Sequence, residues 1–499
     1  MSTAPNFLTQ TAIYSQGINF PENKLNDCII DEQGHFWWYD ATYPDNHFAP
    51  EHHVTGRLKI DKTGATNLDL DGLMPNADGS GEFFASVTDG QPPQAIQGIL
   101  KVSGRHVLLL DAVRNGGTFH SARFSHAEYF ATFSVVGNEP PPRRAKAFKF
   151  SEFDVALKGF EDWLDVGSIR VARTSRTLKL SNTRIPDLAY ETSSGRLIFK
   201  HHLNDSRSGS PRPYEVALRE YLSLQMRFKR GESAEAVLSE LAVLQNLFIV
   251  LTDSDFPLPW PTVTLSRSRK KFTLYFRRLP GSDVPPKWRD CPVRFPQIKD
   301  SFGEMCSQWK AGLKEHGAGY FAFPSTKRKM DQYTENKFSN LTYGLESFHR
   351  SKIGSRPRDS GLQTKIDEIL SQVGAKHRRW LQGALQFQGE PSLKERLIAL
   401  FSMLPIEFDN SLLDDFAKRC ADLRNDIAHF GGKRTRESCA DFLIVVSRLI
   451  EALSVLYHMI LLLDIGVSET LVRKWATTGH QSHVIKYRLI AAGLMKKDS

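Results

Sequence analysis

In the first part of the chain, hydrophobic and polar residues alternate in short runs that are separated by turn residues. Two runs, 56–61 and 67–70, flank a Lys-Thr-Gly-Ala turn, and two more flank Ser103–Gly104. Alternation with a period of two is typical of strands with one buried face, and turn residues between such runs favour antiparallel pairing. Residues 1–230 are therefore predicted to form an antiparallel β-rich domain, either sandwich-like or barrel-like.

The pattern changes from alternation to helical spacing after this β-rich domain. Residues 233–251 carry apolar side chains at intervals of three and four, which predicts a helix. The runs 262–265 and 272–276 lie on both sides of a basic turn and predict a hairpin, and 299–314 again has helical spacing. Residues 231–320 are therefore interpreted as a mixed α/β middle subdomain that belongs to the N-terminal region.

The rest of the chain is almost entirely helical in its pattern. Residues 317–329 contain Gly, Pro and a basic run without a period, and they are interpreted as a linker. After this segment, apolar positions recur at helical spacing and the short connections contain Pro or Gly. The predicted helices cover 335–349, 362–373, 377–388, 392–404, 411–430, 438–464 and 468–476. The sequence thus predicts an α+β multidomain protein in which residues 321–499 form an all-α bundle.

One of these helices contains a run, 442–463, that is apolar enough to cross a membrane. Arg448, Glu451 and His458 interrupt the run, and a charge near the centre of a bilayer is costly, so a buried bundle helix or one at a subunit interface is favoured. The N-terminus shows no secretory signal, and the five cysteines form no CxxC pair. We therefore expect a cytoplasmic protein that does not contact a membrane.

Charge is distributed unevenly along the chain. The formal net charge is +9 at pH 7, although the first 100 residues hold 4 basic and 13 acidic side chains. The largest excess of positive charge lies in residues 101–330. A basic region of this kind indicates either a surface that binds an anion, most commonly nucleic acid, or a solvated face without a partner.

The sequence lacks the common nucleotide and metal signatures. Gly431-Gly-Lys-Arg-Thr lacks the glycine spacing of a phosphate loop, and Arg434 stands after the lysine where such a loop has Ser or Thr. Asp69-Leu-Asp-Leu-Asp lacks the glutamate of a calcium loop. His47, His52 and His53 are more typical of a loop than of a metal site. We therefore expect no metal and no cofactor.

One stretch near the end of the predicted helix 411–430 carries Asn425, Asp426 and His429 on its polar side and Arg424 at the border of that side. Arg424 and Asn425 precede His429, and the apolar positions of the helix step by three and four along the opposite side. Asn425 and His429 are neighbours at a spacing of four, and the two glycines that follow end the helix. Because a helix C-terminus favours a protonated imidazole, His429 is suited to act as a general acid.

The spacing Arg-x(4)-His is short, and it also arises by chance. Other pairs with this spacing or one close to it are Arg114 with His120, Arg196 with His201 or His202, and Arg473 with His480. Only Arg424 and His429 combine a place inside a predicted bundle helix with an Asn directly after the Arg. This pair is therefore the candidate site.

The stretch around Arg424 resembles the HEPN superfamily, whose ribonucleases carry an Arg-x(4–6)-His motif in a helical bundle. Residues 335–349 are similar to the opening helix of the Apea-like HEPN family, and the part that starts with the aromatic-rich run after Gly34 looks like that family's companion domain. The resemblance covers 335–430 closely and 34–320 loosely. It implies a prokaryotic anti-phage ribonuclease that halts the growth of infected cells, and a homodimer or higher oligomer in which two motifs line one cleft.

Within this resemblance, metal-independent RNA chemistry suggests roles for particular residues. The ribose 2′-OH is the nucleophile, so His429 is the candidate for proton transfer and Arg424 for stabilising the phosphorane. Asn425 would orient the histidine or a phosphate oxygen, and Asp426 and Glu346 would support the site. The candidate RNA-binding residues are Lys433, Arg434, Arg436, Arg378 and Arg379. The alternative is that Arg424 only forms ion pairs along its helix.

Two functions from different classes stay open. In the first, an endoribonuclease cuts host or phage RNA, with tRNA among the candidates, and its β-rich region senses an unknown phage-derived trigger. In the second, a catalytically inactive HEPN dimer binds RNA or a protein through the basic middle of the chain. The substitution His429→Ala separates them, because it would abolish the effect of an enzyme and leave a binding module intact.

Overall fold

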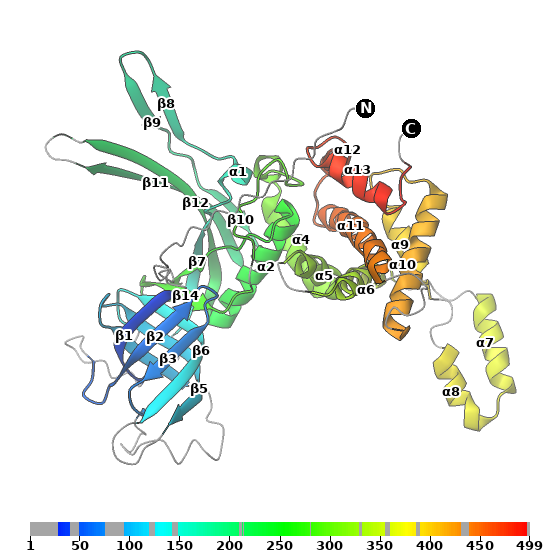
Figure 1. The fold of residues 1–499 in the computed structure, drawn as a ribbon, viewed down its shortest axis with the longest axis horizontal. Coiled ribbons are helices and arrows are strands. Elements are labelled where there is room, and N and C mark those ends of the chain that lie inside the picture. Colours follow the sequence, from blue (N-terminus) through cyan, green and yellow to red (C-terminus); the bar gives the residue numbers. More distant parts are fainter. Residues whose placement is uncertain are drawn as a thin grey trace, which may run out of the picture.

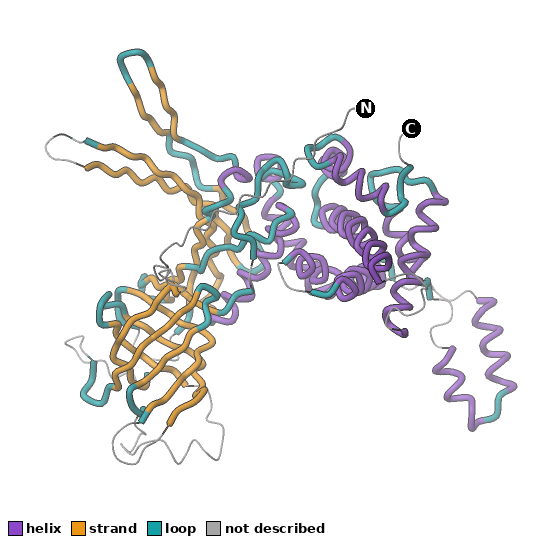
Figure 2. The backbone as a smooth tube through the Cα atoms, viewed as in Figure 1, coloured by secondary structure: helices purple, strands orange, loops and turns teal. Residues whose placement is uncertain are grey.

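The computed structural model describes most of the chain and divides it into a β-rich part and a helical part. The described residues are 28–39, 49–74, 94–118, 125–141, 148–208, 212, 214–279, 281–328, 332–354, 360–385, 390–430 and 439–496. Figures 1 and 2 show the strands gathered on one side of the molecule and the helices on the other. This arrangement confirms the predicted α+β fold class.

Six strands near the N-terminus form a closed antiparallel barrel (Figure 2). They are β1 (Cys28–Trp38), β2 (Val54–Asp61), β3 (Thr66–Leu70), β4 (Gln94–Leu100), β5 (His106–Thr118) and β6 (His126–Gly137). Their order is β6-β3-β2-β1-β4-β5, and pairing between β5 and β6 closes the ring. Along β2, Leu58 and Ile60 are buried while Arg57 and Lys59 are exposed. The alternation in the sequence therefore separates the barrel interior from the solvent.

The sheet continues beyond the barrel as a second antiparallel part. Its strands are β7 (Phe150–Ala156), β10 (Leu188–Glu191), β11 (Gly195–Ser208), β12 (Glu215–Glu232), β13 (Thr262–Leu265) and β14 (Lys271–Phe276). Starting from β6, their order is β14-β13-β7-β12-β11-β10. The predicted hairpin is confirmed as β13 and β14, but it lies between β7 and β6. The segment 231–320 therefore contributes strands to the same sheet as residues 1–230.

Helices pack on this second part of the sheet and then form the C-terminal bundle (Figure 1). The helices before the bundle are α1 (Glu161–Leu164), α2 (Ala234–Thr252), α3 (Phe295–Ile298), α4 (Phe302–His316) and α5 (Ala318–Lys327). Those of the bundle are α6 (Thr334–Lys352), α7 (Ser360–Gln372), α8 (Ala375–Leu385), α9 (Leu393–Phe401), α10 (Asn410–Phe430), α11 (Cys439–Asp464), α12 (Glu469–Thr477) and α13 (Ser482–Ala491). The helices predicted for the bundle are confirmed as α6 to α12, and α13 is an additional helix.

The segment that was expected to link the two regions is a helix. Residues 318–327 form α5, although Gly319 and Pro324 lie within it. Tyr320 and Phe323 are fully buried in the core, and this burial outweighs the low helix propensity of glycine and proline. The predicted linker is therefore wrong, and the boundary that was drawn before the bundle falls inside a packed helix.

The second part of the sheet and the bundle share one hydrophobic core, whereas the barrel interior forms a separate cluster. The ring of Phe323 on α5 lies 4.6 Å from that of His458 on α11, and His458 Nε2 donates to the carbonyl of Val250 on α2 at 2.6 Å. Helices α6 and α11 approach closely at Gly344, where a Cβ would collide with the Tyr457 side chain. The bundle is thus fixed to the sheet by packing on α2 and α5.

Among the described residues, α2 and α11 are long and apolar enough to span a membrane by length and composition. More than half of the most apolar part of each helix is buried inside the protein. Helix α11 contains the run 442–463, and Val446, Leu453 and Leu461 are buried in the shared core. The structure therefore places α11 as a core helix of the bundle, as the interrupting charges predicted.

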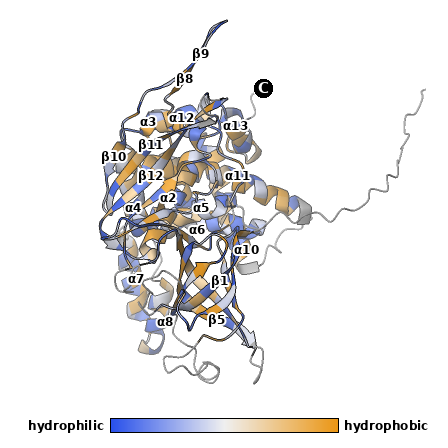
Figure 3. Ribbon diagram, turned by 90° about the vertical axis from the view of Figure 1, so that its left-hand side faces the viewer, coloured by the Kyte–Doolittle hydropathy of each residue, from blue (hydrophilic) through white to orange (hydrophobic). Residues whose placement is uncertain are grey.

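A short β-hairpin and a helical hairpin project from the body of the molecule. The strands β8 (Ile169–Arg173) and β9 (Leu178–Asn182) form a two-stranded hairpin beside the sheet, and α7 and α8 form a helical hairpin beside the bundle. Both stand out in Figure 1 and in the view turned by 90° in Figure 3. No described side chain of α8 is buried, so this helix has one face without a partner in the described chain.

Candidate active site

The predicted catalytic motif lies on α10. Asp409 precedes the helix and accepts hydrogen bonds from the backbone N–H groups of Ser411 and Leu412 at 2.9 and 3.4 Å. The buried residues of the apolar stripe of α10 are Leu413, Phe416, Ala417 and Cys420. The stripe packs against α6 and α9, so the opposite polar side of α10 faces the surface.

The structure brings three of the predicted site residues together. Arg424 Nη2 lies 3.5 Å from Glu346 Oε2 on α6, and Nη1 donates to Asn425 Oδ1 at 3.2 Å. The Arg424 side chain is 40% exposed and that of Glu346 is 16% exposed. The guanidinium is therefore held from one side by a carboxylate and an amide, while a large part of it stays accessible to solvent.

Glu346 belongs to a chain of ion pairs that runs from the surface into the bundle. Arg350, one turn later on α6, lies 3.0 Å from Glu346 and 3.6 Å from Glu390. Glu390 also pairs with Arg396 of α9 at 2.9 Å, and the Arg396 side chain is only 1% exposed. We call these five residues, from Arg424 to Arg396, the arginine–glutamate network.

Arg396 is the buried end of this network. Its Nε donates to the carbonyl of Pro391 at 2.9 Å, and its Nη1 donates to His349 Nδ1 at 3.3 Å. Burial lowers the pKa of Arg396, and neighbouring Arg350 lowers it further. The group stays charged at neutral pH because the usual pKa of arginine is above 12. With a bond from each of its three nitrogens, the charged Arg396 fixes α9 against α6, the helix that carries Glu346.

The sequence predictions included Arg424 and Glu346 but missed the other three residues of the network. Glu346 and Arg350 are four residues apart on one helix, a spacing that favours ion pairs and could have indicated this contact. Glu390 and Arg396 come from a separate segment of the chain. No sequence pattern indicates that they meet α6, because their contact depends on how α9 packs.

His429 lies in the last turn of α10, which ends at Phe430. It follows Arg424 by five residues, a rise of about 7.5 Å along the helix axis. Asp426 is half-buried on the same helix. The RNA-binding candidates Lys433, Arg434 and Arg436 lie outside the described residues. The described site therefore consists of Arg424, Asn425 and Glu346, with the backbone position of His429 beside them.

The other two RNA-binding candidates, Arg378 and Arg379, lie on the projecting helix α8. Both are exposed, and Arg378 Nε donates to the carbonyl of Leu370 on α7 at 3.0 Å. Figures 1 and 3 both show α8 set apart from α10. The structure does not bring these two arginines next to Arg424.

The competing Arg–His pairs and histidines have other surroundings. Arg196 lies on β11 and pairs with Glu191 at 3.4 Å, while Arg473 lies on α12 and His480 lies beyond the end of that helix. His120, the partner of Arg114, is outside the described residues. Among the pairs that are described, the one on α10 alone lies within a single bundle helix.

No group of three possible metal ligands occurs among the described His, Cys, Asp and Glu residues. Of the histidines considered as ligands, His47 lies outside the described residues and His52 is exposed. His53 Nδ1 lies 2.6 Å from the carbonyl oxygen of Pro50, and its ring packs edge-on against His35. The local contacts of His53 thus account for its position.

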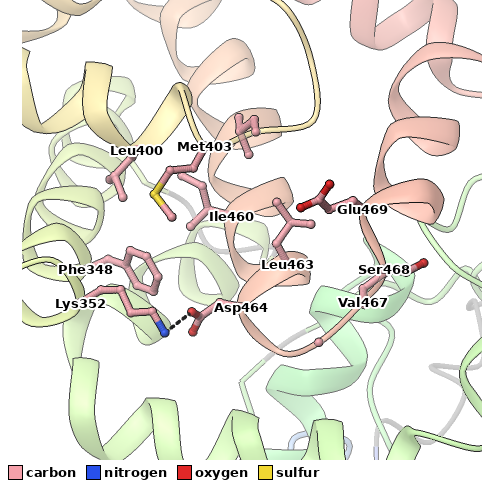
Figure 4. A pocket seen from close by; sticks show the side chains of 12 residues that line it. Phe348, Lys352, Leu400, Met403, Ile460, Leu463, Asp464, Val467, Ser468 and Glu469 are labelled. Carbon is pink, nitrogen blue, oxygen red and sulfur yellow. Dashed lines mark ion pairs between the residues drawn. The ribbon is translucent and has the colours of Figure 1, made fainter.

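A pocket of about 410 Å³ opens between α6, α9, α11 and the start of α12 (Figure 4). Figure 4 shows the ion pair between Lys352 and Asp464, at 2.9 Å, on one side of a largely apolar lining. Neither Arg424 nor Glu346 lines this pocket. The candidate site is instead an accessible surface on α10, a shape that suits an extended polymer better than a small molecule.

The arrangement around Arg424 can bind a phosphate. A guanidinium can donate two parallel hydrogen bonds to phosphate oxygens, and these charge-assisted bonds are stronger than neutral ones. The ion pair with Glu346 is long, so the accessible nitrogens stay available to an anion. His429, in the last turn of the same helix, is the type of residue that transfers protons near neutral pH.

Two family models match the chain. The model described as ApeA N-terminal domain 1 matches residues 32–309, and the model described as Apea-like HEPN matches residues 339–471. No curated protein and no solved structure matches the chain. The first match covers more than half of the 499 residues, and the second includes Glu346, Arg424 and His429. This chain belongs to the ApeA-like HEPN family.

Proposed function

We propose that this protein is a metal-independent HEPN endoribonuclease that acts in anti-phage defence by cleaving RNA and arresting the growth of infected cells. The observation that supports the proposal best is the placement of Arg424. It is held by Glu346 and Asn425 on the accessible side of a bundle helix that also carries His429. The match to the Apea-like HEPN model covers all four residues.

In the proposed reaction, the ribose 2′-OH attacks the adjacent phosphorus and the bond to the 5′-oxygen breaks. The 2′-OH proton leaves to a base, and a proton is delivered to the departing 5′-oxygen; His429 serves in proton transfer. Arg424 stabilises the negative charge of the phosphorane by hydrogen bonds to its oxygens. The products are a 2′,3′-cyclic phosphate, or the 3′-phosphate after hydrolysis, and a 5′-OH. DNA has no 2′-OH, so it cannot react in this way.

The proposed active form is a homodimer of HEPN bundles. One arginine and one histidine are a small set for both proton transfers and charge stabilisation. On a regular helix, five residues correspond to a rotation of about 140° between Arg424 and His429. A second copy of α10 would supply a second Arg and His to one cleft. We further propose that Lys433, Arg434 and Arg436 hold the RNA backbone there.

The β-rich region would control the nuclease. A nuclease that acts on host RNA must be restrained until infection, and the shared core connects the sheet rigidly to the bundle through α2 and α5. A phage-derived trigger that binds the N-terminal region could therefore act on the bundle through these helices. The cytoplasm is the compartment expected for such a protein, and tRNA is among the candidate substrates.

The test is cleavage of RNA by the purified full-length protein in the presence of EDTA. Wild type should cut and leave 5′-OH ends, and His429→Ala should reduce the rate by about 10²–10⁴-fold, the usual contribution of a general acid–base. His480→Ala is the matched control, because it removes an exposed histidine from another Arg–His pair. If wild type is silent, the assay is repeated with lysate of infected cells. Equal cleavage by wild type and His429→Ala would contradict the proposal.

A further inference from the structure

The hairpin of β8 and β9 is an exposed arm with an unusual charge. Every residue from 170 to 184 is exposed, and the hairpin stands away from the sheet in Figures 1 and 3. Its cations are Arg170, Arg173, Arg176, Lys179 and Arg184, whereas no Asp or Glu occurs from 166 to 186. We call residues 169–184 the β8–β9 arm. Its charge is concentrated on one narrow ribbon and is not balanced within it.

The neighbouring long hairpin shows that this imbalance is specific to the arm. Ionisable residues of both signs occur along β11 and β12, among them Lys200, Asp205, Glu215, Arg219 and Glu220. Both hairpins point to the same side of the molecule in Figure 1. A solvent-exposed hairpin on this side of the molecule can thus carry charges of both signs. The all-basic composition of the arm therefore distinguishes it from its neighbour.

The register of the arm gives it two different faces. Arg170 pairs with Ser181 and Ala172 pairs with Lys179, so these four side chains share one polar face. On the other face, Val171 pairs with Leu180 and Arg173 pairs with Leu178. These three aliphatic side chains are exposed to solvent. The arm thus offers cations on both faces, with apolar contact area beside the guanidinium of Arg173.

The arm is ordered by contacts at both of its ends. At its base, Ser168 donates from its backbone N–H and its hydroxyl to Glu220 Oε2, at 2.8 and 2.7 Å, and His201 Nε2 lies 3.1 Å from the same oxygen. At the tip, Thr174 N–H donates to the carbonyl of Thr177 at 2.8 Å. The carboxylate of Glu220 on β12 is thereby bound at the base of the arm. The hairpin between base and tip is therefore formed without a bound partner, and its cations face solvent.

We propose that the β8–β9 arm binds the sugar–phosphate backbone of RNA and holds the substrate of the nuclease, an inference that rests on the proposed ribonuclease function. Arginines spaced along a ribbon can each contact a different phosphate, and such contacts position a nucleic acid without reading its sequence. The exposed Val171, Leu178 and Leu180 can pack on ribose rings. No aromatic residue lies in the arm, so bases do not stack on it and the backbone is the group recognised.

The experiment compares RNA binding by two charge-matched variants of the full-length protein. Both are made in the His429→Ala background so that the probe is not cut. The arm variant is R170Q/R173Q/R176Q/K179Q, and the control is K59Q/K101Q/R269Q/K271Q, which removes four exposed cations outside the arm. The probe is a fluorescein-labelled RNA hairpin, measured by anisotropy at several salt concentrations. The arm variant should bind about tenfold or more weakly, and the slope of log K against log salt should fall by about 3.

The inference has outcomes that are separate from those of the proposed function. Unchanged RNA binding by the arm variant would overturn it, even if His429-dependent cleavage is observed. Unchanged RNA binding together with lost activation by infected-cell lysate would assign the arm to a protein partner, which also overturns it. With His429 restored, the arm substitutions should raise KM and leave kcat within about twofold, because they remove uniform binding far from the reacting atoms. Weaker RNA binding by the arm variant, together with no cleavage by wild type either alone or with infected-cell lysate, would support the role of the arm and contradict the nuclease.

Discussion

The arginine–glutamate network and the β8–β9 arm use the same type of residue in opposite ways. In the network, each arginine faces a carboxylate, and the chain of pairs ends at the buried Arg396. In the arm, five cations lie on one exposed ribbon without an acidic residue. A paired guanidinium has a fixed position, which suits the stabilisation of a particular transition state. Unpaired cations keep their attraction for any anion, which suits the capture of a polymer.

The largest effect should follow from breaking the network at its exposed end. Arg424→Ala should lower kcat for RNA cleavage by about 10²–10³-fold, the range seen when one donor to a developing oxyanion is removed. Arg424→Lys should recover only part of this loss, because an ammonium cannot make the bidentate contact. Single-turnover cleavage measures the effect. A kcat within a factor of two of wild type for Arg424→Ala would make this arginine purely structural.

A second large effect concerns a buried histidine that, unlike Arg396, is neutral. Burial lowers the pKa of His458 to about 4, although Asp253 next to it acts in the opposite direction and Lys327 adds to the lowering. Because the usual value is about 6.5, the neutral imidazole contributes full stability above pH 6.5, and this contribution is lost as the pH falls to about 4. The free energy of unfolding should fall by about 3 kcal/mol over this window. The free energy of unfolding, measured by urea denaturation at several pH values, should depend less on pH for His458→Gln than for wild type.

The buried end of the network should matter for stability more than for chemistry. Glu390→Ala leaves the 1% exposed Arg396 without its carboxylate. Removing one partner of a buried pair is strongly destabilising, but Glu390 is 26% exposed and Arg396 keeps its bond to the carbonyl of Pro391, so we expect a loss of about 2 kcal/mol. Urea denaturation measures it. Glu390→Gln, which keeps a hydrogen-bond acceptor, should cost less; an equal loss would mean that packing and not charge dominates.

Substitution of Glu346, which links Arg424 to the rest of the network, should have a smaller effect that falls mainly on kcat. Glu346→Gln removes the charge that holds Arg424, so kcat should fall by about tenfold while KM stays nearly constant, since an interaction realised in the transition state is weakened. Stability should change by less than about 1 kcal/mol, because both partners reach solvent. The control Arg350→Gln removes the other partner of Glu346. Equal losses in kcat for the two variants would argue against a specific role for Glu346 in positioning Arg424.

The smallest effect should come from the arm. The variant R170Q/R173Q/R176Q/K179Q should change the free energy of unfolding by less than about 0.5 kcal/mol, the usual range for exposed positions outside special features. Thermal unfolding of this variant and of the matched control should therefore coincide. A clear destabilisation would show that the arm cations have partners within the protein, and the contrast with the network would no longer hold.

The sequence could predict elements whose cause is local. The spacing of apolar residues at intervals of three and four predicts the helix of Arg424 and His429, and α10 buries this stripe at Leu413, Phe416 and Cys420. The strands around Leu58 and Ile60 were found from alternation, and these residues fill the barrel. The segment 317–329 was misjudged, since Gly and Pro weaken a helix locally, whereas the burial of Tyr320 and Phe323 stabilises α5 from outside the segment.

For the candidate site, the sequence supplied the residues and the fold supplied their partners. Arg424, Asn425 and His429 lie within six positions of one another, so a motif search finds them. Glu346 was included as a supporting residue, but the route from Glu346 through Arg350 and Glu390 to Arg396 joins two separate segments. Side-chain pairing over such distances depends on helix packing, which no local pattern encodes.

The sequence by itself determined the α+β class, the succession of a β-rich part and a helical part, and the helix on which the candidate motif lies, because these depend on the period of apolar residues and on local turn chemistry. Tertiary structure alone decided that β5 pairs with β6 to close the barrel, that β13 and β14 enter the sheet between β7 and β6, and that Glu346 faces Arg424. These contacts join residues far apart in the chain, and their geometry follows from how whole elements bury their apolar faces together.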